Sequence, residues 1–308
     1  MAFLVWLESI RNPVLDAVMS FFTLFGEELV FMLLALTVFW CVNKKEGYYL
    51  LFLGFFGTVL NQFLKILCRI PRPWVQNPKL TVVGDSKVTA TGYSFPSGHT
   101  QNVTGTLGGI ARWHQKTWLR VACVVTLLLT AFSRMYLGVH TPLDVGVSLA
   151  IGAVLVFVFY PLIQKICQKP NGMYLLLGVM VLVAVAFALY ANLNTFPADV
   201  DPDNLYSARK NSFSLLGALL GFCAGYPIEQ KYIRFPEKAR FWQQLIKIIG
   251  GLAGLMAIKE GLKLLFHAVG LTHVSLNAPR YFAMVFFAAA IWPLIFTKLF
   301  RFGKGETT

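Results

Sequence analysis

Three short clusters of polar residues between positions 65 and 144 carry side chains that could do chemistry. In chain order they are Lys65, six intervening residues and Arg72-Pro73; then Pro96-Ser97-Gly98-His99; then Ser133-Arg134 with His140 and Asp144. They combine cations, a helix-start sequence and two imidazoles. Such groups can bind an oxyanion and transfer it. The clusters therefore predict phosphate chemistry.

The binding part of this chemistry rests on fixed positive charge and on backbone N–H groups. Lys65, Arg72 and Arg134 supply three cations, and an arginine fork matches the oxygens of a phosphate with paired hydrogen bonds. Pro96-Ser97-Gly98 predicts the start of a helix, where unpaired N–H groups face an anion. Gly98 would let the backbone approach that anion closely. Together these residues predict a socket for a tetrahedral oxyanion.

The reactive part rests on two histidines. His140 and Asp144 are four residues apart, so a helical turn would bring them to one face. The carboxylate could then hold one ring nitrogen and leave the other free to attack phosphorus. His99, at the predicted helix start beside the oxyanion, could protonate the leaving alkoxide.

The composition places this chemistry in a membrane. Of the 308 residues 56% are hydrophobic and only 13% are charged, whereas soluble domains carry about 25% charged residues. The net charge of +13 comes from basic residues between long apolar runs, which is typical of membrane topology and does not indicate a nucleic-acid partner. The five cysteines have no metal-ligand spacing, and we expect no metal and no cofactor.

The apolar runs predict an all-α fold, a polytopic helical bundle with about nine transmembrane helices. The stretch before the first run predicts an amphipathic surface helix. We expect a phosphatase core at 1–168 with all three clusters, and an additional transmembrane bundle at 169–308. The predicted spans are 26–42, 47–66, 98–114, 117–136, 143–164, 173–192, 211–228, 244–268 and 281–299.

The basic loops predict which side of the membrane each end of a span faces. Lysines and arginines gather at one end of alternate spans, for example at Lys44, Arg112 and Lys165. The positive-inside rule makes that side cytosolic, with the N-terminus outside and the C-terminus inside. All three clusters then fall on the non-cytosolic side. Basic residues there, such as Lys65 and Arg134, break the rule, and an anionic ligand is one local reason for them.

Each cluster alone also has an ordinary structural interpretation. Pro-Ser-Gly-His occurs in turns, a Lys-Arg-Pro group can be a solvated membrane edge, and the third cluster could be a helix cap with a salt bridge. Their occurrence in order on one predicted side favours a site instead.

The three clusters resemble the signatures KxxxxxxRP, PSGH and SRxxxxxHxxxD of the type 2 phosphatidic acid phosphatase superfamily. The sequence matches each without a mismatch, and the resemblance covers roughly residues 10–165. It implies that His140 forms a phosphohistidine, that His99 is the acid and that Asp144 positions His140. It also implies that no metal is needed, and that phosphate is bound by Lys65, Arg72, Ser97, Gly98 and Arg134.

The resemblance predicts an integral membrane, metal-independent phosphatase that acts on a lipid phosphomonoester or diphosphate. The layout also looks like the sphingosine-phosphate and glucose-phosphate phosphatase branches. We expect the cell membrane if the source is bacterial and the endoplasmic reticulum if it is eukaryotic. A lipid phosphotransferase would use the same site. A transporter or scramblase with a relict site is a third hypothesis, although no internal repeat supports it.

Overall fold

The computed structural model describes residues 1–166, 168–169 and 171–301. Within these residues the chain is helical and contains no strand, which confirms the predicted all-α class. In the described part of the chain, six helical segments are long and apolar enough to cross a membrane: Lys44–Gln76, Thr117–Tyr136, Pro142–Ile166, Gly172–Leu193, Pro202–Ile233 and Val274–Phe300. A bent pair, Pro13–Gly26 with Glu28–Cys41, would make a seventh if it is one span.

The predicted count of nine spans stays a prediction. The predicted span 98–114 consists of three consecutive helical pieces of 6, 5 and 5 residues, the middle one a π-helix at Thr104–Gly108. The predicted span 244–268 lies within one helix of 28 residues. That helix carries Lys247, Lys259, Glu260 and Lys263, so apolar composition alone does not mark it as a span.

The described chain divides into two compact units that are discontinuous in sequence. The first comprises residues 1–34, 49–165 and 193–208, and the second comprises 35–48, 166–192 and 209–308. The domain boundary expected after residue 168 stays a prediction. All eight predicted site residues lie in the first unit.

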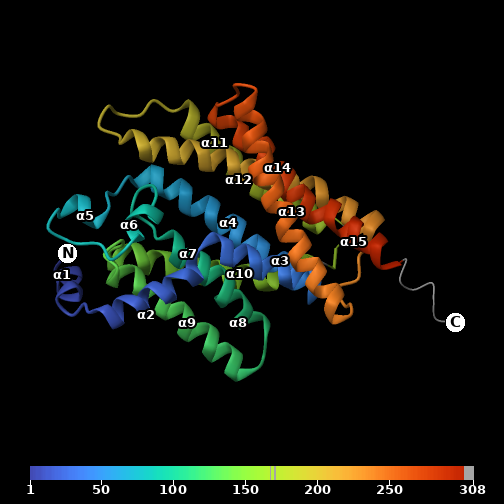
Figure 1. Ribbon diagram of the computed structural model, residues 1–308, viewed down its shortest axis with the longest axis horizontal. Coiled ribbons are helices and arrows are strands. Elements are labelled where there is room, and N and C mark those ends of the chain that lie inside the picture. Colours follow the sequence, from blue (N-terminus) through green and yellow to red (C-terminus); the bar gives the residue numbers. More distant parts are fainter. Residues whose placement is uncertain (167, 170, 302–308) are drawn as a thin grey trace. The chain divides into compact units, whose positions relative to one another are not determined.

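The first unit holds the helices that position the predicted site (Figure 1). Complete within it are α1 (Ala2–Ser9), α2 (Pro13–Thr23), α5 (Pro73–Gln76), α6 (Ser86–Thr89), α7 (Gly98–Val103), α8 (Gly109–Trp113) and α9 (Thr117–Tyr136). It also holds the start of α3 (Glu28–Cys41), most of α4 (Lys44–Cys68) and nearly all of α10 (Pro142–Ile166).

The N-terminal helices pack against the end of α9. Figure 1 shows α2 in blue beside α9 in green, and these two helices are in contact. Leu4 and Leu7 of α1 and Met19 of α2 share a buried apolar cluster with Leu137 and Val139, just before His140. Burial of such side chains contributes about 1.5–3 kcal/mol each. The N-terminal region therefore supports the turn that carries His140.

The bent pair begins with a strongly specified helix. The side chain of Asn12 caps α2 by accepting a hydrogen bond from the N–H of Leu15 at 3.0 Å, and Pro13 occupies the first helical turn. A 3-10 turn at Leu24–Gly26 follows, and Glu27 has an extended backbone before α3 begins at Glu28. The two helices meet at 50°.

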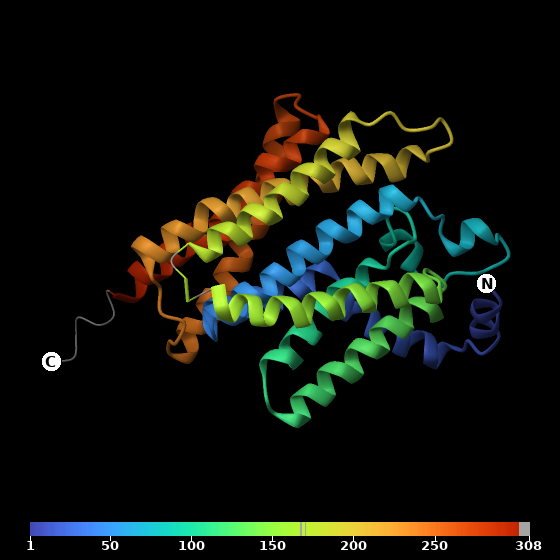
Figure 2. The same cartoon turned by 180° about the vertical axis from the view of Figure 1, so that it is seen from behind.

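The second unit contains α13 (Phe241–Ala268), α14 (Asn277–Phe286) and α15 (Trp292–Arg301), with nearly all of α11 (Gly172–Leu193) and most of α12 (Pro202–Ile228). Its α11 and α12 run side by side (Figure 2). It contains an ion pair between the partly buried Lys44 and the buried Glu229, with Nζ 2.6 Å from Oε1. Glu229 also accepts a hydrogen bond from the hydroxyl of Tyr48 at 2.9 Å.

Candidate active site

The first cluster holds a loop in place. Nζ of the buried Lys65 donates to the backbone carbonyl of Tyr93 and, at 3.4 Å, to that of Ser94. Nε and Nη2 of Arg72 donate to the carbonyls of Gly92 at 3.0 Å and Thr91 at 2.7 Å. Both cations therefore order residues 91–94, which lead into the second cluster. Sequence reasoning gave them a phosphate-binding role and did not foresee this one.

The second cluster begins a helix as predicted. Ser97 caps α7, because its Oγ accepts from the N–H of Thr100 at 3.4 Å and from its hydroxyl at 2.9 Å. The N–H of Ser97 donates to the carbonyl of Asp144 at 3.2 Å. Ser148 donates to the carbonyls of Ser97 and Asp144, both at 2.9 Å. These bonds join the helix start to the third cluster.

The third cluster places His140 in a tight turn after α9. The carbonyl of Arg134 accepts from the N–H groups of Val139 at 3.1 Å and His140 at 3.2 Å. Gly138 makes this turn with φ +82°. A Cβ at Gly138 would lie 2.7 Å from the carbonyl oxygen of Thr81 and 2.9 Å from Nη2 of Arg11. Only glycine fits this turn without displacement of its neighbours.

Asp144 has two functions at the start of α10. Its Oδ2 accepts from the N–H of Thr141 at 2.8 Å, and Thr141 Oγ1 accepts from the N–H of Asp144 at 3.2 Å. This reciprocal pair is a capping box. The same Oδ2 lies 3.4 Å from Nδ1 of His140 and accepts from Oγ of Ser94 at 2.6 Å. The cap fixes the carboxylate in position to orient the imidazole.

The partners of His140 define its tautomer. Nη1 of Arg72 lies 2.9 Å from Nε2 of His140, and both side chains are buried. Arginine can only donate hydrogen bonds, so Nε2 is the acceptor and carries the lone pair. The ring proton therefore lies on Nδ1, facing Asp144. Burial, together with the nearby charges of Arg72, Lys65 and Arg134, holds the pKa of His140 well below its usual 6.5. The ring is neutral, and its Nε2 is unprotonated.

Among the cations of the three clusters, Arg134 has buried donor nitrogens without a hydrogen-bond partner. It is 1% exposed, and its Nη1 donates to Oγ1 of Thr23 at the end of α2. Its Nε and Nη2 have no hydrogen-bond partner among the described residues. Buried donors of this kind are costly to leave unpaired, so an anion is a suitable partner.

His99 occupies the second position of α7, and its Nε2 lies 3.0 Å from Oε1 of Glu27. Sequence reasoning did not identify Glu27, Thr23 or Ser94. No local signal marks them, because their partners are distant in the chain. Thr141 could have been found, since Thr141-Pro142-Leu143-Asp144 matches the capping-box spacing.

A pocket of about 620 Å³ lies beside the first polar cluster, and Arg72 is the predicted site residue in its lining. Arg69, Trp74 and Tyr93 also line this pocket. The loop before α12 provides Asp199 and Asp201, and the first turn of α12 provides Asp203. Its size suits a small ligand or a head group.

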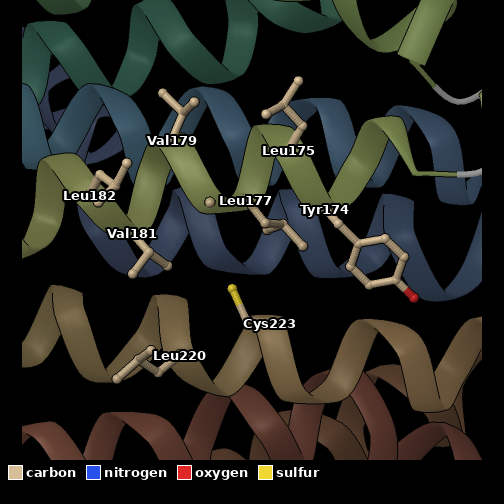
Figure 3. A pocket seen from close by; sticks show the side chains of 9 residues that line it. Tyr174, Leu175, Leu177, Val179, Val181, Leu182, Leu220 and Cys223 are labelled. Atoms are coloured by element: carbon tan, nitrogen blue, oxygen red, sulfur yellow. The ribbon is translucent and has the colours of Figure 1, made fainter.

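A second pocket of about 610 Å³ lies between α11 and α12 in the second unit (Figure 3). Figure 3 shows the thiol of Cys223 directed toward α11 among leucine and valine side chains. Apart from that thiol and the hydroxyl of Tyr174, the side chains lining the pocket are hydrocarbon. It therefore lacks the groups needed for phosphate chemistry.

Across the described residues, no three His, Cys, Asp or Glu side chains are grouped so as to hold a metal ion. The positive charge available to an anion at the candidate site comes from Arg134, Arg72 and Lys65.

Comparison with known proteins shows the family to which the chain belongs. Residues 46–167, which include all three motifs, match the PAP2 superfamily. Undecaprenyl-diphosphatase BcrC of Bacillus subtilis (strain 168) is 32% identical over 155 residues, which are 49% of this chain and 76% of that protein. The chain belongs to the PAP2 superfamily. The resemblance inferred from the motifs is thereby confirmed.

The second half of this PAP2 phosphatase also has a known counterpart. Residues 213–304 match the PAP2 superfamily phosphatase, transmembrane extension, so the chain is an integral membrane protein. Dihydrosphingosine 1-phosphate phosphatase YSR3 of Saccharomyces cerevisiae is 22% identical over 72% of this chain and 55% of that protein. Lipid phosphate phosphatase delta of Arabidopsis thaliana is 24% identical over 76% of this chain and 56% of that protein. No solved structure matches.

Proposed function

We propose that this PAP2 phosphatase hydrolyses a lipid phosphomonoester or diphosphate through a phosphohistidine at His140. The observation that carries the proposal is the state of the imidazole. Nε2 of His140 accepts a hydrogen bond from Arg72 at 2.9 Å, while Asp144 lies 3.4 Å from Nδ1. A buried neutral imidazole with an unprotonated Nε2, beside a carboxylate, has the arrangement of an activated nucleophile once the phosphate takes over the N–H of Arg72.

In the first step the lone pair of His140 Nε2 forms a bond to phosphorus. The bond from phosphorus to the leaving oxygen breaks, and its electron pair goes to that oxygen. His99 donates a proton to the oxygen as it leaves, so a phosphomonoester releases its alcohol and a diphosphate releases the lipid monophosphate. Asp144 stabilises the positive charge that develops on the ring of His140.

In the second step water completes the hydrolysis. His99, now neutral, takes a proton from water, and the resulting hydroxide oxygen bonds to phosphorus. The phosphorus–nitrogen bond breaks, and its electron pair returns to Nε2 of His140. Inorganic phosphate then leaves, and both histidines are restored.

The negative charge of the transferring group is met by fixed donors. The unpaired Nε and Nη2 of Arg134 support a role in binding phosphate oxygens. The N–H groups at the start of α7, which begins at Gly98 after the cap residue Ser97, support the same role. Arg72 would move one N–H from His140 to the phosphate, and Lys65 adds positive charge. Three cations supply the electrostatic stabilisation that a metal gives elsewhere, so we expect no metal requirement.

The substrate class follows from the relatives and from the pocket. The similar proteins are named for a polyprenyl diphosphate, a sphingoid base phosphate and lipid phosphates in general. These substrates share a terminal phosphoryl group on a long apolar chain. The pocket of about 620 Å³ beside Arg72 has room for the head group of such a lipid.

The lipid is identified by measurement of phosphate release from purified protein. The panel is polyprenyl diphosphate, phosphatidate, phosphatidylglycerophosphate, a sphingoid base phosphate and glucose 6-phosphate. We expect turnover of at least one lipid, inhibition by vanadate, and no loss in a metal chelator. His140→Ala should remove turnover and the acid-labile phosphoenzyme trapped from labelled substrate, and purify as folded protein. A phosphoenzyme that persists in His140→Ala would disprove the assignment of the nucleophile.

The site is proposed to face the non-cytosolic side, on the basis of the alternation of basic loops. Cysteine in place of Asp85, in the exposed loop before the second cluster, should react with an impermeant thiol reagent on sealed cells. Cysteine in place of Gln115, between α8 and α9, should react only after permeabilisation. Because native Cys68 is exposed, both variants are made in a Cys68→Ser background. The reverse labelling pattern would overturn the proposed sidedness.

A further inference from the structure

A second histidine–carboxylate pair lies in the first unit. Here the carboxylate precedes the histidine in the chain, whereas His140 precedes Asp144. Oε1 of Glu27 is 3.0 Å from Nε2 of His99, although the residues are 72 positions apart. Glu27 stands in the break between α2 and α3, where the backbone is extended. The side chain of His99 is 14% exposed and that of Glu27 is 36% exposed, so the histidine is mostly buried and the carboxylate is partly open to solvent.

The segment that carries Glu27 is fastened to the site at three further points. A Cβ at Gly26 would lie 2.7 Å from Cβ of His99, so this backbone touches the histidine directly. Nδ2 of Asn102, one turn along α7, donates to the carbonyl of Gly26 at 3.3 Å. Thr23 accepts from Nη1 of Arg134. The contact between Glu27 and His99 is thus one of several that join this segment to the site, which distinguishes it from an isolated pairing of two side chains.

We propose that Glu27 is a positioning residue that orients His99 and fixes which of its ring nitrogens exchanges the proton. This inference rests on the proposed function, in which His99 is the acid. An ionised carboxylate only accepts hydrogen bonds, so it keeps a proton on Nε2 of His99. Nδ1 is then the atom that gives its proton to the leaving oxygen and later takes one from water. Glu27 stays ionised throughout and stabilises the imidazolium before the proton is given.

Leaving groups of different basicity separate this role from a structural one. A lipid alkoxide needs a proton as it departs, whereas the phenolate of p-nitrophenyl phosphate does not. The quantity compared is kcat/KM, which reports events up to the first irreversible step. If formation of the phosphoenzyme is irreversible, kcat/KM therefore does not report the hydrolysis of the phosphoenzyme by water, a step that both substrates share. The lipid is the best substrate found in the panel above.

Glu27→Gln keeps the size of the side chain and removes its charge. We expect it to lower kcat/KM for the lipid by at least about tenfold, a fraction of the 10²–10⁴ that general acid catalysis supplies. The loss for p-nitrophenyl phosphate should be below about threefold. That retained activity also shows that the variant is folded. Glu28→Gln, the same charge change at the next, exposed residue, is the matched control and should change neither value.

The double variant gives an independent readout. If Glu27 acts through His99, Glu27→Gln in a His99→Ala background should cause no further loss. Equal losses on both substrates in Glu27→Gln, or additive losses in the double variant, would refute the positioning role. A failure of the proposed function, in which His99 is the acid, would give a different result. If His99→Ala itself lost both substrates equally, His99 would not be the acid, and the inference about Glu27 would fall with it.

Discussion

Nη1 of Arg72 donates a hydrogen bond to Nε2 of His140 at 2.9 Å, across 68 positions of the chain. The ring nitrogen assigned to attack phosphorus is therefore an acceptor before any substrate arrives. The same guanidinium also donates to the carbonyls of Thr91, Gly92 and Val139. One side chain thus links the loop before the second cluster to the proposed nucleophile.

Arg72→Lys should lower kcat/KM for the lipid by roughly 100-fold, because a compact ammonium cannot replace a planar fork with several donors. The protein should also be less stable, since the loop carbonyls lose partners. Arg120→Lys is the control, because Arg120 also donates to backbone carbonyls, those of Ala111 and His114, away from the cluster. Activity within about threefold of the unchanged protein in Arg72→Lys would exclude a direct role at the nucleophile.

Asp144→Asn should lower kcat by roughly 10²–10⁴-fold, because the amide can impose the wrong tautomer on His140. Thr141→Ala separates this effect from helix capping. It removes the hydroxyl that accepts from the N–H of Asp144 and leaves the carboxylate in place. We expect a cost of about 1 kcal/mol in the free energy of unfolding, with kcat nearly unchanged. Comparable kcat losses in both variants would mean that Asp144 acts through the helix start alone.

Gly138→Ala should lower both stability and activity. Alanine at φ +82° costs about 1–2 kcal/mol, and its Cβ would also crowd Thr81 and Arg11. Gly84→Ala is the matched control, because Gly84 has φ +54° and nothing within 4 Å of the added Cβ. The difference between their melting temperatures in detergent measures the crowding alone. Equal shifts would mean that the Gly138 turn relaxes freely.

The titration of His140 should occur at low pH. Its pKa is lowered by burial and by Arg72, Lys65 and Arg134, so the ring stays neutral as the pH falls through 6.5. It should gain a proton only well below that value, and the nucleophile should be lost only there. Imidazole NMR signals of the solubilised protein, recorded from pH 8 to 5, test this directly. The protein has five histidines, and the His140 signal is the one missing from His140→Ala. A midpoint at or above 6.5 would contradict the expectation.

The sequence alone determined the chemical groups and their local geometry. The spacing of His140 and Asp144 along a helix start, and of Pro96, Ser97 and Gly98 at another, is local. Backbone geometry therefore fixes it within a few residues. Composition determined the membrane class in the same way, because hydropathy sums over neighbouring residues.

The number of spans was less predictable, for a physical reason. Hydropathy reports how apolar a segment is, and does not distinguish a helix facing lipid from one buried among other helices. The segment 98–114 is apolar and helical, yet it is broken by a π-helix and carries the buried polar residues Gln101 and Thr104.

Only the tertiary structure decided which distant residues meet. Glu27 reaches His99, and Thr23 reaches Arg134 across 111 positions, through helix packing that no short motif encodes. It likewise gave Lys65 and Arg72 the carbonyls of residues 91–94 as partners. A charged side chain in the sequence carries no information on whether a ligand or a buried carbonyl will satisfy it. That choice depends on which backbone groups the folded chain leaves without partners.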